Sequence, residues 1–147
     1  MPGLTELDPA AARDWIARWD RQQEVYLSDR EERFTALIDA VEAGAGRPDP
    51  LVLDLGCGPG SLSARLLARL PAATVIAVDA DPVTLSLGRA AYGGVPGLRF
   101  LDIDLRSAGW ERELGRLRKR ERAGGRPARA RSQGQTPARE RQSGRAD

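Results

Sequence analysis

Apolar residues recur along this chain at two different spacings. In the opening stretch they return every three or four positions, which is typical of one face of a helix. The clearest example is the set Phe34, Leu37, Ile38 and Val41. Further along, short continuous apolar runs are typical of strands that are buried on both faces. These runs are 51–55, 74–79 and 98–103.

Start and stop signals predict where the helices lie. Two helices are expected to begin at an aspartate followed by proline, because the aspartate caps free amides and proline is tolerated in the first turn. These starts are Asp8-Pro9 and Asp81-Pro82. Residues 28–31 predict a capping box for a further helix, with Gly44 as its C-cap. Another helix is expected over 61–70, before a proline.

Strands that alternate with helices across short connections predict a parallel α/β sheet. This pattern holds as far as Trp110, and 111–117 is expected to complete one more helix. From residue 118 onward the chain contains no Val, Ile, Leu, Phe, Tyr or Trp. Such a composition buries too little apolar surface to offset the loss of chain entropy, so 118–147 is predicted to be a disordered, Arg-rich tail.

Charge is distributed unevenly between these two regions. Residues 1–110 contain 11 Arg against 16 Asp and Glu, a net charge of −5, whereas residues 111–147 contain 12 Lys and Arg against 5 acids, a net charge of +7. A basic tail suggests a hypothesis of nucleic-acid binding through phosphates, confined to 118–147. We favour instead an out-of-frame or truncated end, because only one of the basic residues is lysine and no aromatic residue is interleaved for base stacking.

The rare residue types exclude several kinds of chemistry. Cys57 is the only cysteine and histidine is absent, so an intrachain disulfide, a His-based triad and a zinc site that needs imidazole are excluded. The first residues lack the pattern of a signal peptide, and no apolar run approaches the roughly 18 residues of a membrane span. We therefore expect a cytoplasmic protein with no membrane partner.

The candidate chemistry lies in the glycine-rich segment after the first predicted strand, residues 54–60, Asp-Leu-Gly-Cys-Gly-Pro-Gly. Glycines permit positive φ and let a ligand approach the backbone closely. A dinucleotide site requires G-x-G-x-x-G, but here the third glycine comes one place early and Ser61 occupies the expected position. Asp54 would repel a pyrophosphate, whereas it suits a ligand that carries an ammonium group.

In these residues the chain resembles the class I S-adenosylmethionine (SAM)-dependent methyltransferases. The D-x-G-x-G-x-G of 54–60 matches the first motif of that family, and Asp79 follows Gly56 at the expected spacing of 79 − 56 = 23 residues. Residues 98–105 look like the third-strand motif. The opening helices, with 19–23 and Tyr26, resemble the helical cap over the cofactor.

This resemblance implies a Rossmann-like, doubly wound parallel sheet that is incomplete, with about three strands after N-terminal helices. The implied parts are a helical cap at 1–50 and a SAM-binding α/β half-domain at 51–117. The implied cofactor contacts are Asp54, Gly56, Cys57, Gly58, Gly60, Asp79, Ala80, Asp104 and Leu105. Asp79 would accept from the ribose hydroxyls, Asp104 from the adenine amino group, and the amide of Leu105 would meet the ring.

Several interpretations stay open beside these. Asp102 is a rival to Asp104, Cys57 is expected to fill a small-residue position, and Trp15, Trp19 and Tyr26 are expected to pack in the core or lid. The resemblance implies methyl transfer to an unidentified acceptor, a small molecule first of all. No metal and no catalytic residue is assigned, and the missing later strands imply an inactive, truncated chain. An NAD(P)-dependent oxidoreductase is the alternative enzyme.

Overall fold

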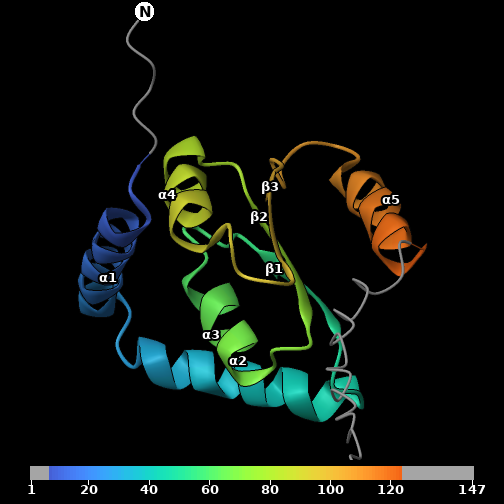
Figure 1. Ribbon diagram of the computed structural model, residues 1–147, viewed down its shortest axis with the longest axis horizontal. Coiled ribbons are helices and arrows are strands. Elements are labelled where there is room, and N and C mark those ends of the chain that lie inside the picture. Colours follow the sequence, from blue (N-terminus) through green and yellow to red (C-terminus); the bar gives the residue numbers. More distant parts are fainter. Residues whose placement is uncertain (1–6, 124–147) are drawn as a thin grey trace, which may run out of the picture. The chain divides into compact units, whose positions relative to one another are not determined.

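The computed structural model describes residues 7–123, which fall into two compact units, 1–110 and 111–147. The helices and strands follow in the order α1 (Pro9–Tyr26), α2 (Arg30–Ala45), β1 (Leu51–Leu55), α3 (Ser61–Arg69), β2 (Thr74–Asp79), α4 (Pro82–Tyr92), β3 (Leu98–Asp102) and α5 (Trp110–Ala123) (Figure 1). The first seven elements lie in the first unit. The described part of the second unit lies within α5.

The strands of the described residues form a three-stranded parallel sheet in the order β1-β2-β3. Leu53 lies opposite Ile76, which lies opposite Arg99, and Asp79 lies opposite Asp102. Parallel strands with a helix between each pair form the α/β architecture that the sequence predicts. The predicted class, an incomplete Rossmann-like sheet, is therefore confirmed for this part of the chain.

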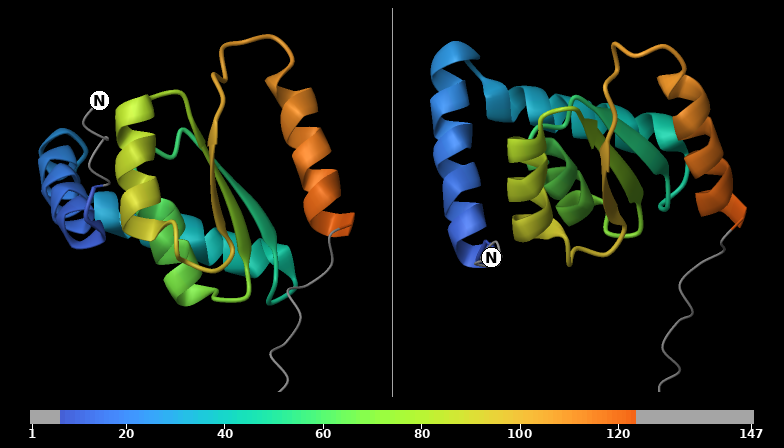
Figure 2. Two further views of the ribbon diagram at one scale, coloured as in Figure 1. Left: turned by 45° about the horizontal axis from the view of Figure 1, so that its top comes forward. Right: turned by 90° about the horizontal axis from the view of Figure 1, so that it is seen from above.

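One face of the sheet is covered by α3 and α4, and α2 packs beside α3 (Figures 1 and 2). The core between these layers is apolar, and β2 is almost wholly buried because it has a partner strand on each side. The buried residues of this core are Ile38, Cys57, Leu66, Leu67, Ala73, Val75, Ala77, Leu85 and Leu98. This core fixes the ends of β1 and β2, where the candidate residues lie.

Helix α1 packs along α4 through small and apolar residues, namely Ala12 and Ile16 against Ala91, with Leu87, Ala90 and Tyr92 partly buried beside them. Trp15 and Tyr26 are 56% and 78% exposed, so these two do not pack in the core, and their expected place in a lid stays a prediction. Ala12 and Ile16 are one turn apart, and their smaller side chains let the two helices approach closely.

Of the three predicted N-terminal caps, two are confirmed and one is wrong. Asp8 accepts from the amide of Ala11, and Asp81 accepts from the amide of Val83. The capping box at 28–31 does not form: α2 begins at Arg30, after Asp29 with φ of +62° and no capping hydrogen bond. Helix α2 also passes Gly44 and ends before Gly46, which takes the left-handed conformation that glycine adopts without strain.

Helix α5 runs to Ala123, so the prediction that the helix ends at Leu117 and that disorder begins at 118 is wrong for 118–123. Arg, Lys, Glu and Ala are good helix formers, and Glu111 and Glu113 suit the first turn. The rest of the predicted tail, 124–147, lies outside the described residues. Within 7–123, no helix has the length and apolar character needed to cross a membrane.

Candidate functional site

The glycine-rich loop joins β1 to α3 and is tied by its backbone to the end of β2. The amides of Gly56 and Cys57 both donate to the carbonyl of Val78, at 2.8 and 2.9 Å, and the amide of Gly60 donates to the carbonyl of Cys57 at 3.0 Å. These bonds hold the loop as one tight turn above the carboxyl ends of the strands, where parallel α/β sheets bind their ligands.

The glycines of the loop serve two purposes. Gly56, Gly58 and Gly60 all have positive φ, at 78°, 54° and 86°. A Cβ on Gly60 would lie 2.8 Å from the ring of Phe100, so this glycine lets α3 start close against β3. A Cβ on Gly56 or Gly58 would meet nothing within 4 Å, so open space lies over these two residues. The loop thus packs inward at Gly60 and leaves its backbone accessible at Gly56 and Gly58.

Asp79 closes β2 and holds the loop through its carboxylate. Its Oδ2 accepts from the amide of Gly58 at 2.7 Å, and its Oδ1 accepts from the amides of Ala80 and Asp81 at 2.7 and 3.0 Å. Partial burial of Asp79 opposes ionisation, but the three amide donors outweigh it and hold the pKa of Asp79 below its usual value. Asp79 is therefore ionised at neutral pH.

The same contacts limit how Asp79 can receive a ligand. A carboxylate offers about four acceptor positions, and three of those on Asp79 are taken by backbone amides. One further donor can bind at Oδ2 while the loop keeps this geometry. Two hydroxyl donors at once, as the sequence analysis expects, would require the Gly58 amide to leave Oδ2.

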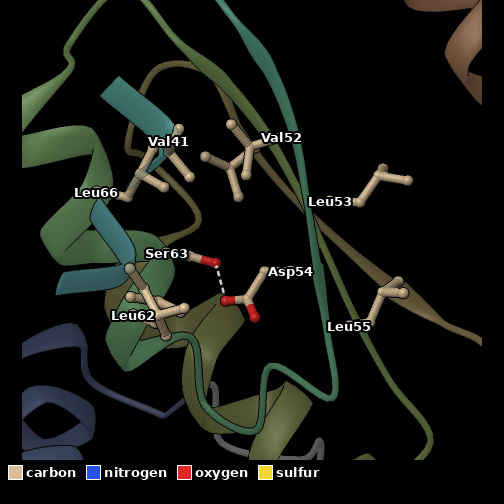
Figure 3. Close-up of a pocket in the computed structure, with 10 residues that line it drawn as sticks. Val41, Val52, Leu53, Asp54, Leu55, Leu62, Ser63 and Leu66 are labelled. Carbon is tan, nitrogen blue, oxygen red and sulfur yellow. Dashed lines mark hydrogen bonds between the residues drawn. The ribbon is translucent and has the colours of Figure 1, made fainter. Parts of the chain in front are cut away.

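Asp54 faces α3 from the end of β1. The hydroxyl of Ser63 donates to its Oδ2 at 2.6 Å, as Figure 3 shows. Burial raises the pKa of Asp54, and the charge of Asp79 raises it further against the lowering effect of the Ser63 hydrogen bond. A half-buried acid beside a second acid gives this end of the sheet a negative potential.

The thiol of Cys57 is affected by the negative potential of these two acids. Cys57 is 8% exposed and free, and its Sγ donates to the carbonyl of Gly58 at 3.3 Å. Burial, followed by the charges of Asp54 and Asp79, raises the pKa of Cys57 to about 12. A thiol with so high a pKa is not a nucleophile at neutral pH, which supports the prediction that Cys57 fills a small-residue position.

The end of the third strand is built differently. Asp104 and Arg106 form a two-pronged ion pair, with Nε and Nη2 of Arg106 at 3.0 and 3.1 Å from the carboxylate. The hydrogen bond from the Arg106 side chain, and then the one from its amide, lower the pKa of Asp104. The rival residue, Asp102, lies directly opposite Asp79 in the sheet, and Leu105 follows Asp104 in the turn.

A cluster that the sequence analysis did not single out lies beside the loop, and it comprises Asp20, Arg30, Ser61 and Arg65. We call it the Asp20 cluster. The carboxylate of Asp20 accepts from Arg30 at 2.8 Å, from the Ser61 hydroxyl at 2.7 Å and from Arg65 at 3.1 Å. Two of its members carry a signal in the sequence: Asp20 lies within 19–23, which resembles the helical cap, and Ser61 occupies the position of the missing third glycine of a dinucleotide motif.

A small hollow of about 160 Å³ lies along β1 on the side of α2 and α3 (Figure 3). Val52 and Asp54 point into it, whereas Leu53 and Leu55 lie on the other side of the strand (Figure 3). Asp54 and Ser63 are its polar residues, and they bond to each other. Such a lining suits apolar packing and not a charged ligand, so we place the candidate site at the loop. Across residues 7–123, no group of three His, Cys, Asp or Glu side chains is arranged to hold a metal ion.

Comparison with known proteins agrees with this arrangement. Residues 52–114 match the family described as "Methyltransferase domain". The match includes the loop, Asp79 and the end of the third strand.

Two curated relatives are trans-aconitate 2-methyltransferases. The protein from Azoarcus sp. (strain BH72) is 37% identical over 89 residues, which is 60% of this chain and 33% of the relative. The protein from Methylobacterium nodulans is 34% identical over 92 residues, 63% of this chain and 34% of the relative. This chain spans about a third of the length of these relatives. A SAM-bound amino pentose methyltransferase from Micromonospora echinaspora is 24% identical with a TM-score of 0.47, over 60% of this chain and 35% of that chain.

Proposed function

We propose that the loop and the ends of the three strands bind S-adenosylmethionine, and that the protein is a methyltransferase. The observation that carries the proposal is the pair of carboxylates on either side of an accessible glycine backbone. Asp54 and Asp79 flank the loop, and their charges add to the effect of burial in raising the pKa of Cys57. A site of negative potential favours a ligand with a positive sulfonium and an ammonium group.

The residues of the loop fit the shape of such a ligand. Open space over Gly56 and Gly58 leaves room for a ligand against the backbone, and Cys57 and Gly60 keep the turn tight. We assign the ribose to Asp79, beside Ala80, because its Oδ2 retains a free acceptor position. Asp104 and Leu105 are assigned to the adenine, and Asp54 to the amino-acid end of the ligand.

When bound, SAM supplies a methyl group activated by the sulfonium, and transfer of that group to an acceptor leaves S-adenosylhomocysteine. The task of the protein is then to hold the acceptor in line with the methyl group. The residues described above bind and orient the cofactor, and none of them is assigned a catalytic role. The absence of histidine from the sequence is compatible with this chemistry.

The alternative enzyme, an NAD(P)-dependent oxidoreductase, has less support. A pyrophosphate would rest on the amides at the start of α3. Asp54 and Asp79 lie near this point, and each adds negative charge that would repel phosphate. The nucleic-acid hypothesis depends on the tail, of which 124–147 lies outside the described residues.

For the acceptor, the names of the relatives indicate a small carboxylic acid. We therefore propose a small-molecule acceptor and would assay trans-aconitate and similar di- and tricarboxylates first. A cytoplasmic location is part of the same proposal, supported by a lone, buried cysteine that forms no disulfide.

Titration calorimetry with SAM, S-adenosylhomocysteine and NAD in parallel tests the proposal. We expect binding of the first two and none of NAD. The Asp79→Ala variant should weaken binding about tenfold or more, because a hydrogen bond to a charged acceptor contributes about 1.5–3 kcal/mol. Binding of NAD alone would reverse the assignment, and unchanged affinity in the variant would remove Asp79 from the site.

A further inference from the structure

The Asp20 cluster brings together three helices at the point where α3 leaves the glycine loop. Asp20 comes from α1, Arg30 from the first position of α2, and Ser61 and Arg65 from the first turns of α3. The side chains of Asp20 and Arg30 are only 15% and 10% exposed. A charge this well buried persists only when it is paired and hydrogen-bonded, and Asp20 receives three donors.

The two arginines of the cluster are themselves held in place. Arg65 makes a bidentate contact with Glu31 of α2, at 2.9 and 2.6 Å, and donates to the carbonyl of Ser61 at 2.9 Å. Both guanidinium groups lie over the ring of Phe34, with centroid distances of 4.4 Å for Arg30 and 5.3 Å for Arg65. The guanidinium groups of Arg30 and Arg65 are therefore held both by carboxylates and by the ring of Phe34, so Asp20 is held in one position.

A fourth helix contributes through Tyr92 at the end of α4. Burial and the charge of Asp20 raise the pKa of Tyr92, so its hydroxyl lies within the field of the cluster. The ring of the same tyrosine would lie 3.8 Å from a Cβ on Gly60. Tyr92 thus lies near the last glycine of the loop and is influenced by the charge of Asp20.

The contacts of Asp20 offset backbone strain in the connection between α1 and α2. Asp29 has φ of +62° and gives no capping hydrogen bond to α2. A residue with a Cβ is strained in this conformation and persists only where the surroundings hold it. The bond from Arg30 to Asp20 spans this connection and holds the start of α2 against the end of α1.

We propose that Asp20 is a positioning residue that couples the helical cap of α1 and α2 to the glycine loop, through Ser61. This proposal rests on the assignment of the loop as a cofactor site. Ser61 follows Gly60 directly, so the bond from its hydroxyl to Asp20 fixes the residue at which the loop becomes helix. The cap thereby sets the geometry of the loop backbone without touching the ligand itself.

Amide hydrogen exchange on the full chain, without ligand, tests the coupling. The amides of Gly58, Gly60 and Ala64 are hydrogen-bonded within or beside the loop, so their exchange reports its opening. In Asp20→Asn we expect these amides to exchange about tenfold faster, because a charge-assisted bond to Ser61 is weakened. The amides of β2 should keep their rates.

Glu42→Gln is the matched control. Glu42 of α2 pairs with Arg69 of α3 at 2.6 Å, so it also joins the N-terminal helices to α3, but at the end of α3 far from the loop. This variant should leave the exchange of the loop amides unchanged. Ser61→Ala is a milder test of the same link and keeps both ion pairs of Asp20, so it covers the case in which Asp20→Asn does not fold. It should reproduce the faster exchange confined to the loop.

The affinity for S-adenosylhomocysteine completes the test. It is measured for Asp20→Asn, for Ser61→Ala and for the variant that carries both changes. If Asp20 acts through Ser61, each single change weakens binding and the second change adds little to the first. Unchanged exchange at the loop, equal acceleration in loop and β2, or additive losses of affinity would overturn the proposal. If the unaltered chain binds no such ligand, the proposed function fails, while the exchange rates still decide whether the coupling exists.

Discussion

The ends of β2 and β3 carry the two acids assigned to the nucleoside part of the ligand, and they are built in different ways. Asp79 is held by three backbone amides, one of them from the glycine loop of another element. Asp104 is held by a single neighbour, Arg106, through its side chain and its amide. The side chain of Arg106 is 89% exposed and that of Asp104 is 38% exposed.

This difference determines how each acid meets a ligand. Backbone amides keep Asp79 in place whether or not a ligand is present, so little ordering cost remains at binding. The pair of Asp104 and Arg106 must open or share its carboxylate before another donor can enter, and an exposed ion pair contributes little to stability. In the proposed site, Asp79 would accordingly be a preorganised contact and Asp104 an adaptable one.

The largest effect should come from Gly60, the glycine at which the loop packs against β3. In Gly60→Ala the new Cβ would lie 2.8 Å from the ring of Phe100, at a φ of +86°. Overpacking and positive φ together should lower the free energy of unfolding by about 2–4 kcal/mol. Urea denaturation measures the loss. Gly44→Ala is the control: it lies inside α2 with no neighbour within 4 Å, so it should leave the protein as stable or more so.

The next effect concerns acid stability through Asp79. Its pKa is lowered in the folded protein, so its contribution is complete above its unfolded pKa of about 3.9 and is lost as the pH falls through the folded value. The unaltered chain should therefore lose stability below about pH 4 more steeply than Asp79→Asn. Urea midpoints between pH 7 and pH 3 measure this. If the urea midpoints of the two proteins fell equally with pH, the amide donors would not favour the ionised form of Asp79.

Asp54 should show the opposite sign. Because burial raises its pKa, the folded protein gains stability as the pH falls through that pKa, and ionised Asp54 is a cost at pH 7. In Asp54→Asn the amide oxygen can still accept from Ser63, so we expect the free energy of unfolding to stay level or rise by about 1 kcal/mol. The affinity for SAM should fall about fivefold, since one charge-assisted contact is lost.

A fall in stability without a fall in affinity would show that Asp54 acts only within the fold. Ser63→Ala is the matched control, because it removes the other partner of the bond and leaves the charge of Asp54 in place. It should destabilise the protein at pH 7 by leaving a buried carboxylate without its donor.

The sequence predicts most of this arrangement because the strands and the loop have strong local signals. Apolar runs locate the three strands, and the acid-glycine spacing locates the loop and Asp79. The start of α2 was predicted wrongly, because the bond from Arg30 to Asp20 across the connection decides where that helix begins, and not a local capping box. The end of α5 was predicted wrongly because the prediction took the lack of apolar residues after 117 as the end of the helix. Residues 118–123 are good helix formers and continue the helix without them.

The contacts of the Asp20 cluster could not be predicted, since Asp20 lies 10, 41 and 45 positions from its three partners and the set shares no spacing with a known chemistry. Ion pairs between helices depend on tertiary packing, which one sequence does not display. The motif at 54–60 is predictable for the opposite reason, because a tight turn over a strand end requires glycine at fixed positions.

The smallest effect should come from Asp104, and it decides between Asp104 and Asp102. Asp104→Ala should weaken SAM binding about twofold to tenfold, the range of one ordinary hydrogen bond. It should leave the urea midpoint unchanged, because the residue is exposed. If Arg106 competes with the ligand for the carboxylate of Asp104, Arg106→Ala should bind SAM slightly more tightly than the unaltered chain.

Asp102→Asn is the matched comparison, since Asp102 lies opposite Asp79 in the sheet. A loss of affinity in Asp102→Asn with none in Asp104→Ala would move the adenine contact back onto the strand, beside the acid that holds the ribose.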